Sequence, residues 1–261
     1  MKERIITALV AGAIFITTLI YGQHWIVDGL LLFIALVSAA EWANLLALPQ
    51  PKKGFFIFLV GALTLAALQV PLLAKALIAL VATGWLCTVP WLLYKYERVQ
   101  TLQITDKHIA GTGVASLAAF VAAVDLVYGQ LGSWGTLALF LIIWVSDSVA
   151  YFVGRKWGKT PLAPHVSPKK TREGLLGGVG SALLLALLFL LFFNLPGSKA
   201  LFLVLSVLAV FYGVLGDLWE SVLKRRAGLK DSGRILPGHG GMLDRIDSWL
   251  SAFPIWALAF L

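Results

Sequence analysis

The chain of 261 residues is 59% hydrophobic and only 13% charged, with a mean hydropathy of +0.88. Soluble domains carry roughly 25% charged residues, so this composition excludes an ordinary soluble protein and indicates one that crosses a membrane several times. The formal net charge is +8. Cys87 is the single cysteine, which excludes an intrachain disulfide and a cysteine metal cluster.

Apolar runs of about 20 residues follow one another along the chain, each long enough to cross a hydrocarbon core of ~30 Å as a helix. Unpaired backbone groups are costly in lipid, so the runs must be helical. About nine spans are predicted, near residues 5–21, 25–46, 55–73, 76–94, 110–128, 134–153, 175–193, 199–223 and 242–261. The first lacks a signal-peptide cleavage site and is expected to be retained. The expected fold class is an all-α polytopic membrane protein, with residues 1–261 as a single integral membrane domain.

Lysine and arginine residues set the orientation of these spans. If the N-terminus is cytoplasmic, all of the 21 basic residues except Lys75 and Lys199 fall in cytoplasmic segments. This pattern predicts a cytoplasmic N-terminus and a periplasmic C-terminus. Two cytoplasmic segments, 154–174 and 223–245, hold more than half of the basic residues, which is more than orientation requires.

Acidic residues inside apolar runs are the strongest functional signal, because an Asp at the centre of a membrane helix costs about 2.5–3.5 kcal/mol on insertion scales. Asp28 and Asp125 fall near the outer ends of their spans, where a plain surface role is expected. The other acids of interest fall near the cytoplasmic ends of four spans: Glu41, Asp147, Asp217, Glu220, Asp244 and Asp247. Their convergence predicts a carboxylate cluster at the cytoplasmic face.

Two sets of side chains in the last two spans repeat one helical spacing: Asp217, Glu220 and Ser221, then Asp244, Asp247 and Ser248. Residues three and four apart share a helical face. If the two helices are antiparallel neighbours joined by the loop of residues 224–242, both sets meet at one depth. Carboxylates that face each other repel, and a cation or basic side chains must offset the repulsion.

Two interpretations of these acids stay open. In the first, Asp217 or Asp244 pairs with Arg225 or Arg245 only to fix helix packing. In the second, the acids bind a divalent metal, and carboxylate and hydroxyl oxygens without a Cys or His cluster suit Mg²⁺ far better than Zn²⁺. Mg²⁺ takes its remaining ligands from water and phosphates, so this interpretation indicates a nucleotide or another polyphosphate.

The two basic segments interleave Lys and Arg with Gly and Pro, which exposes backbone N–H groups and charged side chains suited to phosphate oxygens. Such loops also bind anionic lipid headgroups, and that alternative stays open for each loop taken alone. His239, between two glycines, is either a phosphate donor or a turn residue. A structural role is expected for His165, and none is assigned to His24 or His108.

The C-terminal passage resembles the signature of the phosphatidate cytidylyltransferase family, the CDP-diacylglycerol synthases of bacterial inner membranes. That signature combines Ser, Lys-Arg, Lys-Asp, a Leu-Pro-type pair, His-Gly-Gly and Asp-Arg-hydrophobic-Asp at fixed spacing. Its positions are filled by Ser221, Lys224, Arg225, Lys230, Asp231, Gly233, Leu236, Pro237, His239, Gly240, Gly241, Asp244, Arg245 and Asp247. So many fixed positions over 27 residues make a chance match negligible.

Residues 146–174 resemble a second motif of the same family. Its positions are filled by Ser146, Asp147, Tyr151, Gly154, Arg155, Gly158, Lys159, Pro164, Ser167, Pro168, Lys169, Thr171, Glu173 and Gly174. Farther upstream, "KERIITALV" and "EWANLLAL" look like looser family features, whereas residues 50–140 add only apolar spans. The domain thus divides into less-matched N-terminal spans, 1–140, and a catalytic C-terminal region, 141–261.

The resemblance implies transfer of the cytidylyl group of CTP to phosphatidate, giving CDP-diacylglycerol and pyrophosphate. It implies Mg²⁺ as cofactor, and a carboxylate cluster of this kind can hold a second cation beside it. The metal ligands would be Asp217 and Asp244. The catalytic residues would be Asp217, Ser221, Lys224, Arg225, Asp244 and Asp247, with Glu220 in support. The substrate-binding residues would be Lys159, Ser167, Lys169, Thr171, Lys230, Asp231, His239 and Arg245.

The same resemblance implies a bacterial inner-membrane enzyme with its active site at the cytoplasmic face. Its partners would be CTP, phosphatidate, membrane lipids and a second copy in a homodimer, with no nucleic acid. The chemistry is simple, because the second pKa of a phosphomonoester is about 6 and the attacking phosphate needs no general base. The site must supply in-line placement and neutralise charge as pyrophosphate leaves.

Two other functions fit part of the same sequence pattern. An ion-coupled transporter also carries intramembrane acids, but usually near the midplane between repeated halves, and here the acids lie toward one face without a visible repeat. A CTP-dependent enzyme for another lipid, such as a polyprenol kinase or an archaeal-lipid cytidylyltransferase, is the closer alternative. The complete signature argues against the kinase, whereas span sequences do not identify the lipid tails.

Overall fold

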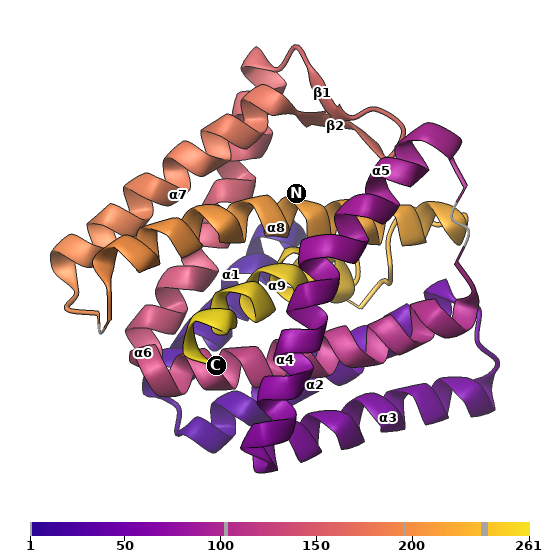
Figure 1. Ribbon diagram of the computed structural model, residues 1–261, viewed down its shortest axis with the longest axis horizontal. Coiled ribbons are helices and arrows are strands. Elements are labelled where there is room, and N and C mark those ends of the chain that lie inside the picture. Colours follow the sequence, from indigo (N-terminus) through magenta and orange to yellow (C-terminus); the bar gives the residue numbers. More distant parts are fainter. Residues whose placement is uncertain (1, 102–103, 196, 236–239) are drawn as a thin grey trace.

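The computed structural model describes residues 2–101, 104–195, 197–235 and 240–261, most of them in helices (Figure 1). The helices are α1 (Lys2–Tyr21), α2 (His24–Leu45), α3 (Gln50–Gln69), α4 (Pro71–Thr83), the π-helical turn η1 (Gly84–Thr88), α5 (Val89–Val99), α6 (Asp106–Trp157), α7 (Arg172–Phe192), α8 (Lys199–Arg226), α9 (Leu243–Ala257) and the 3₁₀ turn η2 (Leu258–Phe260). Within the described residues, six helical segments are long and apolar enough to cross a membrane: α2, α3, the continuous stretch Pro71–Val99, α6, α7 and α8. The expectation of an all-α polytopic membrane protein is confirmed at this level.

The predicted spans fall on helices, but their bounds differ. The third and fourth spans were expected to begin near residues 55 and 76, whereas α3 begins at Gln50 and α4 at Pro71. Both helices carry a proline in their first turn, where its missing N–H costs nothing and its fixed φ favours the helix. The prolines of "PQPKKG" and "VPLL" thus mark where α3 and α4 begin, so the non-helical breaks before these two spans are shorter than predicted.

The predicted fifth and sixth spans both lie in α6, which is 52 residues long. The helix is interrupted at Gly132, whose φ of 69° and ψ of −177° suit glycine far better than other residues. The two arms of α6 run in clearly different directions (Figure 1). The break coincides with the sequence "GQLGS". The apolar part of α1, Leu9–Tyr21, and the 15-residue α9 are shorter than a full span, so the number of spans stays a prediction.

Helix α9 lies inside the bundle rather than on its surface. Its residues from Ser248 to Ala257 are all buried, and Trp249 and Phe253 pack on Phe140 of α6 with ring centroids 4.6 and 4.4 Å apart. Small residues let α8 approach it closely: a Cβ atom at Gly216 would clash with the Asp247 carbonyl oxygen. This close crossing brings the acids of α8 and α9 to one place.

A short β-hairpin connects α6 to α7 and was not predicted. Its strands β1 (Pro161–Ala163) and β2 (Ser167–Thr171) pair antiparallel, with Ala163 opposite Ser167. The buried side chains of Ala163 and Val166 join a small apolar cluster with residues of α5 and α8. Strands this short and this polar give no alternating apolar pattern, so the sequence indicated only a basic loop.

Candidate functional site

The Lys224 ammonium group lies at the centre of the candidate site. Its Nζ atom is 2.6 Å from Glu220 Oε2 on the same helix, α8, and 2.6 Å from Asp244 Oδ1 on α9. The side chains of Lys224, Glu220 and Asp244 are 15%, 4% and 6% exposed. Charged groups buried to this extent are tolerated only when they are paired, and here one lysine ammonium group forms ion pairs with two carboxylates.

Asp244 also organises the loop between α8 and α9. Its Oδ2 atom accepts hydrogen bonds from the Ser232 amide and hydroxyl, both at 3.0 Å, and from the Gly241 amide at 2.8 Å. Asp244 lies in the first turn of α9, outside the six candidate spans, where the helix dipole favours a negative charge. The hydrogen bonds from the Gly241 and Ser232 amides and the contact with the Lys224 ammonium group all favour the ionised carboxylate.

Glu41, at the C-terminal end of α2, caps the start of α9. Its carboxylate accepts hydrogen bonds from the Met242 amide at 3.0 Å, the Leu243 amide at 2.7 Å and the Ser232 hydroxyl at 3.3 Å. The first N–H groups of a helix have no carbonyl acceptor within that helix, so the Glu41 carboxylate supplies the missing acceptor. The sequence placed Glu41 among the converging acids but gave it no specific role. Its partners lie about 200 residues away in the chain, and no local pattern reveals such a contact.

Replacing Glu41 with alanine is expected to lower the free energy of unfolding by about 1–3 kcal/mol, because buried amides and a hydroxyl lose their acceptor. Glutamine keeps the shape and one carbonyl acceptor, so Glu41→Gln is expected to lose less. Unfolding of the purified variants in detergent measures both effects. An alanine variant as stable as the wild type would show that the cap contributes nothing.

Asp217, on α8, forms an ion pair with a residue of the hairpin and not with Lys224. Its Oδ2 atom is 2.7 Å from Lys170 Nζ on β2, and its Oδ1 atom accepts a hydrogen bond from Ser221 Oγ at 3.3 Å. The family resemblance implies Lys169 as a substrate-binding residue and assigns no role to Lys170. Neighbouring residues of a strand point to opposite faces, and only the position of the hairpin decides which lysine faces the acids.

Two further acids complete the cluster. Asp147 Oδ2, from the second arm of α6, accepts a hydrogen bond from Ser248 Oγ at 3.2 Å, and Asp247 Oδ1 accepts one from the Ser248 amide at 2.7 Å. Gly216, the neighbour of Asp217 in the chain, packs on the Asp247 carbonyl oxygen, and Lys224 joins Glu220 to Asp244. The acids of α6, α8 and α9 therefore form a single group, named here the acid cluster: Asp147, Asp217, Glu220, Asp244 and Asp247.

The acid cluster carries more negative charge than the described residues neutralise. Lys170 and Lys224 are the bases in ion-pair contact with these five carboxylates in the described ranges. Glu220 Oε1 is buried and has no hydrogen-bond partner there. Carboxylate and hydroxyl oxygens with unbalanced negative charge fit a hard divalent cation such as Mg²⁺. Both oxygens of each predicted ligand already have a partner, but the Asp217 side chain is 36% exposed and that of Asp244 only 6%, so Asp217 is the more accessible of the two.

The remaining predicted site residues lie on or just before the hairpin, near the facing ends of α8 and α9, or in the sequence between these two helices. Arg225 Nε donates to the Val166 carbonyl oxygen at 2.6 Å and so ties α8 to the hairpin, away from the acid cluster. Thr171 Oγ1 accepts from the Gly174 amide and caps α7. Ser167 on β2 is half-buried. Lys159, Lys169, Lys230, Asp231 and Arg245 are exposed, and His239 lies outside the described residues.

The hairpin is held in place by carboxylates on both sides. Glu97 of α5 accepts hydrogen bonds from the His165 and Val166 amides, at 3.1 and 2.9 Å, and from His165 Nδ1 at 2.9 Å. Glu173 accepts from the Lys159 and Thr160 amides, at 3.0 and 3.2 Å. The hairpin thereby keeps Lys170 over the acid cluster.

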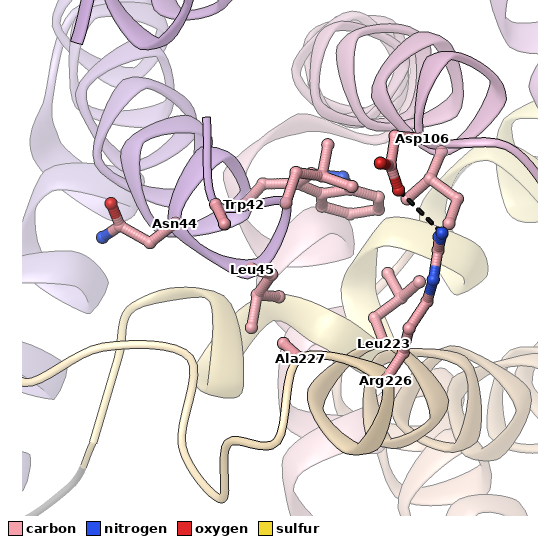
Figure 2. Close-up of a pocket in the computed structure, with 10 residues that line it drawn as sticks. Trp42, Asn44, Leu45, Asp106, Leu223, Arg226 and Ala227 are labelled. Carbon is pink, nitrogen blue, oxygen red and sulfur yellow. Dashed lines mark hydrogen bonds and ion pairs between the residues drawn. The ribbon is translucent and has the colours of Figure 1, made fainter. Parts of the chain in front are cut away.

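Several cavities lie near this region in the described part of the chain, one of them against the hairpin itself. Figure 2 shows a notch of about 280 Å³ between the ends of α2 and α8 and the start of α6, where Arg226 and Asp106 form an ion pair of 2.7 Å. None of its lining residues belongs to the acid cluster. A larger apolar cavity of about 900 Å³ lies between the α4–η1–α5 stretch and the first arm of α6, and it reaches Trp219, the neighbour of Glu220 in the chain.

Comparisons with known proteins give a consistent result. Residues 2–261 match the sequence profile described as the Cytidylyltransferase family. The chain is 36% identical to the phosphatidate cytidylyltransferase of Bacillus subtilis over 97% of this chain and 95% of that protein. It is 36% identical to that of Pseudomonas aeruginosa over 98% and 96%, and 50% identical to that of Haemophilus influenzae over 46% and 43%.

Proposed function

Because the chain belongs to the cytidylyltransferase family, we propose that it transfers the cytidylyl group of CTP to phosphatidate, giving CDP-diacylglycerol and pyrophosphate. The observation that carries this proposal is the meeting of the two family motifs: Arg225 of the C-terminal signature donates to the Val166 carbonyl oxygen of the upstream motif. Beside it, Lys170 of the upstream motif contacts Asp217, four residues before the signature, and within the signature Lys224 contacts Asp244. Such a mixture of acids and bases suits a metal-bound triphosphate and a lipid phosphate better than either alone.

In the proposed reaction an oxygen of the phosphatidate phosphate attacks the α-phosphorus of CTP. The bond from that phosphorus to the bridging oxygen breaks, and pyrophosphate leaves with the electron pair. Lys170 and Lys224 lie where they can hold phosphate oxygens in line while keeping the acids paired. Bound Mg²⁺, held by Asp217 with Asp147 and Asp247 beside it, would supply charge neutralisation at the triphosphate. Asp244, a predicted ligand, would orient Lys224 and the loop.

The membrane arrangement is part of the proposal. Nine spans, a cytoplasmic N-terminus, a periplasmic C-terminus and an inner-membrane location are supported by the positions of the basic residues and by the family's bacterial members. CTP would then reach the acid cluster from the cytoplasm. The cavity that reaches Trp219 would offer the acyl chains an apolar path between the helices. A homodimer is proposed from the family resemblance.

An acceptor panel tests the proposal. The purified protein is incubated with labelled CTP and Mg²⁺ together with phosphatidate, polyprenols, other lipid phosphates or archaeal-type lipids. Pyrophosphate release is expected with phosphatidate, to stop on chelation with EDTA and to return when Mg²⁺ is added back. Release with a different lipid, and none with phosphatidate, would overturn the assignment of the acceptor.

A further inference from the structure

A second group of metal-ligating side chains lies at the opposite end of α2 from Glu41. His24 and Asp28 occupy positions four apart on α2, and Asp125 lies on the first arm of α6. His24 Nε2 is 2.7 Å from Asp125 Oδ1 and 3.9 Å from Asp28 Oδ1. One ligand atom from each of the three residues lies within 4.8 Å of the other two. The sequence suggested only surface roles for the two acids and none for the histidine.

A simple ion pair does not account for this group. Asp28 Oδ1 is buried and has no hydrogen-bond partner among the described residues. Among the described residues, His24 is the sole ion-pair partner of Asp28 and of Asp125. One imidazolium offsets at most one of two negative charges. The side chains of Asp28 and Asp125 are 22% and 30% exposed near the outer ends of their spans, so a cation from the water has access to the remaining carboxylate charge.

We propose that His24, Asp28 and Asp125 bind a divalent transition-metal cation, with Zn²⁺ as the favoured ion. Zn²⁺ binds both imidazole nitrogens and carboxylate oxygens, so His24 and the two acids can supply three ligands, with water in the remaining position. Imidazole also favours Zn²⁺ over the hard ions Mg²⁺ and Ca²⁺. The His24–Asp125 hydrogen bond must open by a side-chain rotation to admit the ion. The Tyr128 ring, 4.9 Å from the His24 ring centroid, packs against the imidazole.

This site is separate from the acid cluster. Glu41 lies 17 positions after His24 on α2, which is about 26 Å at 1.5 Å per residue. The ion would join α2 to the first arm of α6 at the end of the bundle farther from Glu41. Its expected effect is therefore on stability and metal content rather than on CTP turnover.

Metal binding to the purified, chelator-treated protein tests the proposal. Zn²⁺ is titrated in the presence of excess Mg²⁺. The Mg²⁺ occupies sites formed by carboxylates alone, so that Zn²⁺ binding there does not interfere. We expect one Zn²⁺ per chain, a melting temperature raised by several degrees, and at least tenfold weaker binding in Asp28→Asn and in Asp125→Asn. His108→Gln is the matched control: His108 is exposed and contacts Thr105, and its loss should leave Zn²⁺ binding unchanged.

Equal Zn²⁺ binding by the wild type and Asp28→Asn would overturn the site and leave only the His24–Asp125 hydrogen bond. A second readout needs no variant. Co²⁺ in place of Zn²⁺ is expected to give the visible absorption bands of a four- or five-coordinate ion. Failure of the wild type to give such bands would also overturn the proposal, whatever its cytidylyltransferase activity.

Discussion

Replacing Lys224 with methionine is expected to abolish CDP-diacylglycerol formation and to lower the free energy of unfolding by about 3–5 kcal/mol. Lys224 is largely buried and its Nζ atom lies 2.6 Å from both Glu220 and Asp244. Without the ammonium group, two buried carboxylates face each other with no shared partner. Denaturant unfolding in detergent measures the stability, and labelled CTP measures the turnover.

A double variant separates the two effects. In Lys224→Met combined with Glu220→Gln, one of the two buried charges is gone, so much of the stability is expected to return. Activity is not expected to return, because the phosphate-binding ammonium group is still missing. If Lys224→Met alone keeps the stability and turnover of the wild type, Lys224 is not the centre of the site.

Asp217→Asn is expected to lower turnover by ~10²–10³-fold, the usual cost of removing one group that stabilises developing charge. Its effect on stability should be small, because the Asp217 side chain is 36% exposed and its ion pair with Lys170 is partly open to solvent. Asparagine keeps an oxygen that accepts the Ser221 hydrogen bond. Initial rates with saturating CTP and phosphatidate, together with the melting temperature, measure both effects.

Asp106→Asn provides the matched control for Asp217→Asn. Asp106 forms an ion pair of the same length, 2.7 Å, with Arg226, but it lies in the notch of Figure 2 and outside the acid cluster. The chemical change is identical, so turnover of Asp106→Asn should stay near that of the wild type. Near-normal turnover of Asp217→Asn would remove Asp217 from the catalytic residues.

Hydropathy predicts most of the helices, and turn-forming residues such as glycine predict the breaks between them. The "GQLGS" break is a real interruption at Gly132, because glycine accepts the positive φ there. The hairpin was missed because its two strands are held by Glu97 and by packing on α5 and α8, which are distant in sequence. The last predicted span, 242–261, coincides with α9 and the 3₁₀ turn that follows it, but hydropathy did not reveal that this helix is buried, because a buried helix is as apolar as one that faces lipid.

For the candidate site, helical spacing indicated which acids of α8 and α9 share a face, and the structure brings those acids together. Spacing within one helix does not reveal partners on another. Lys170 over Asp217, Glu41 at the start of α9 and the double pairing of Lys224 all depend on tertiary contacts. The catalytic roles of these residues and the Mg²⁺ site stay predictions until the variants are measured.

The position of the radioactive label in the lipid product tests the central proposal most directly. The purified wild-type protein is given phosphatidate and Mg²⁺ with CTP labelled either at the α-phosphorus or at the γ-phosphorus. Cytidylyl transfer predicts that the α-label enters the lipid and that the γ-label leaves in pyrophosphate. Transfer of the γ-label to a lipid, or no label in any lipid, would contradict the account.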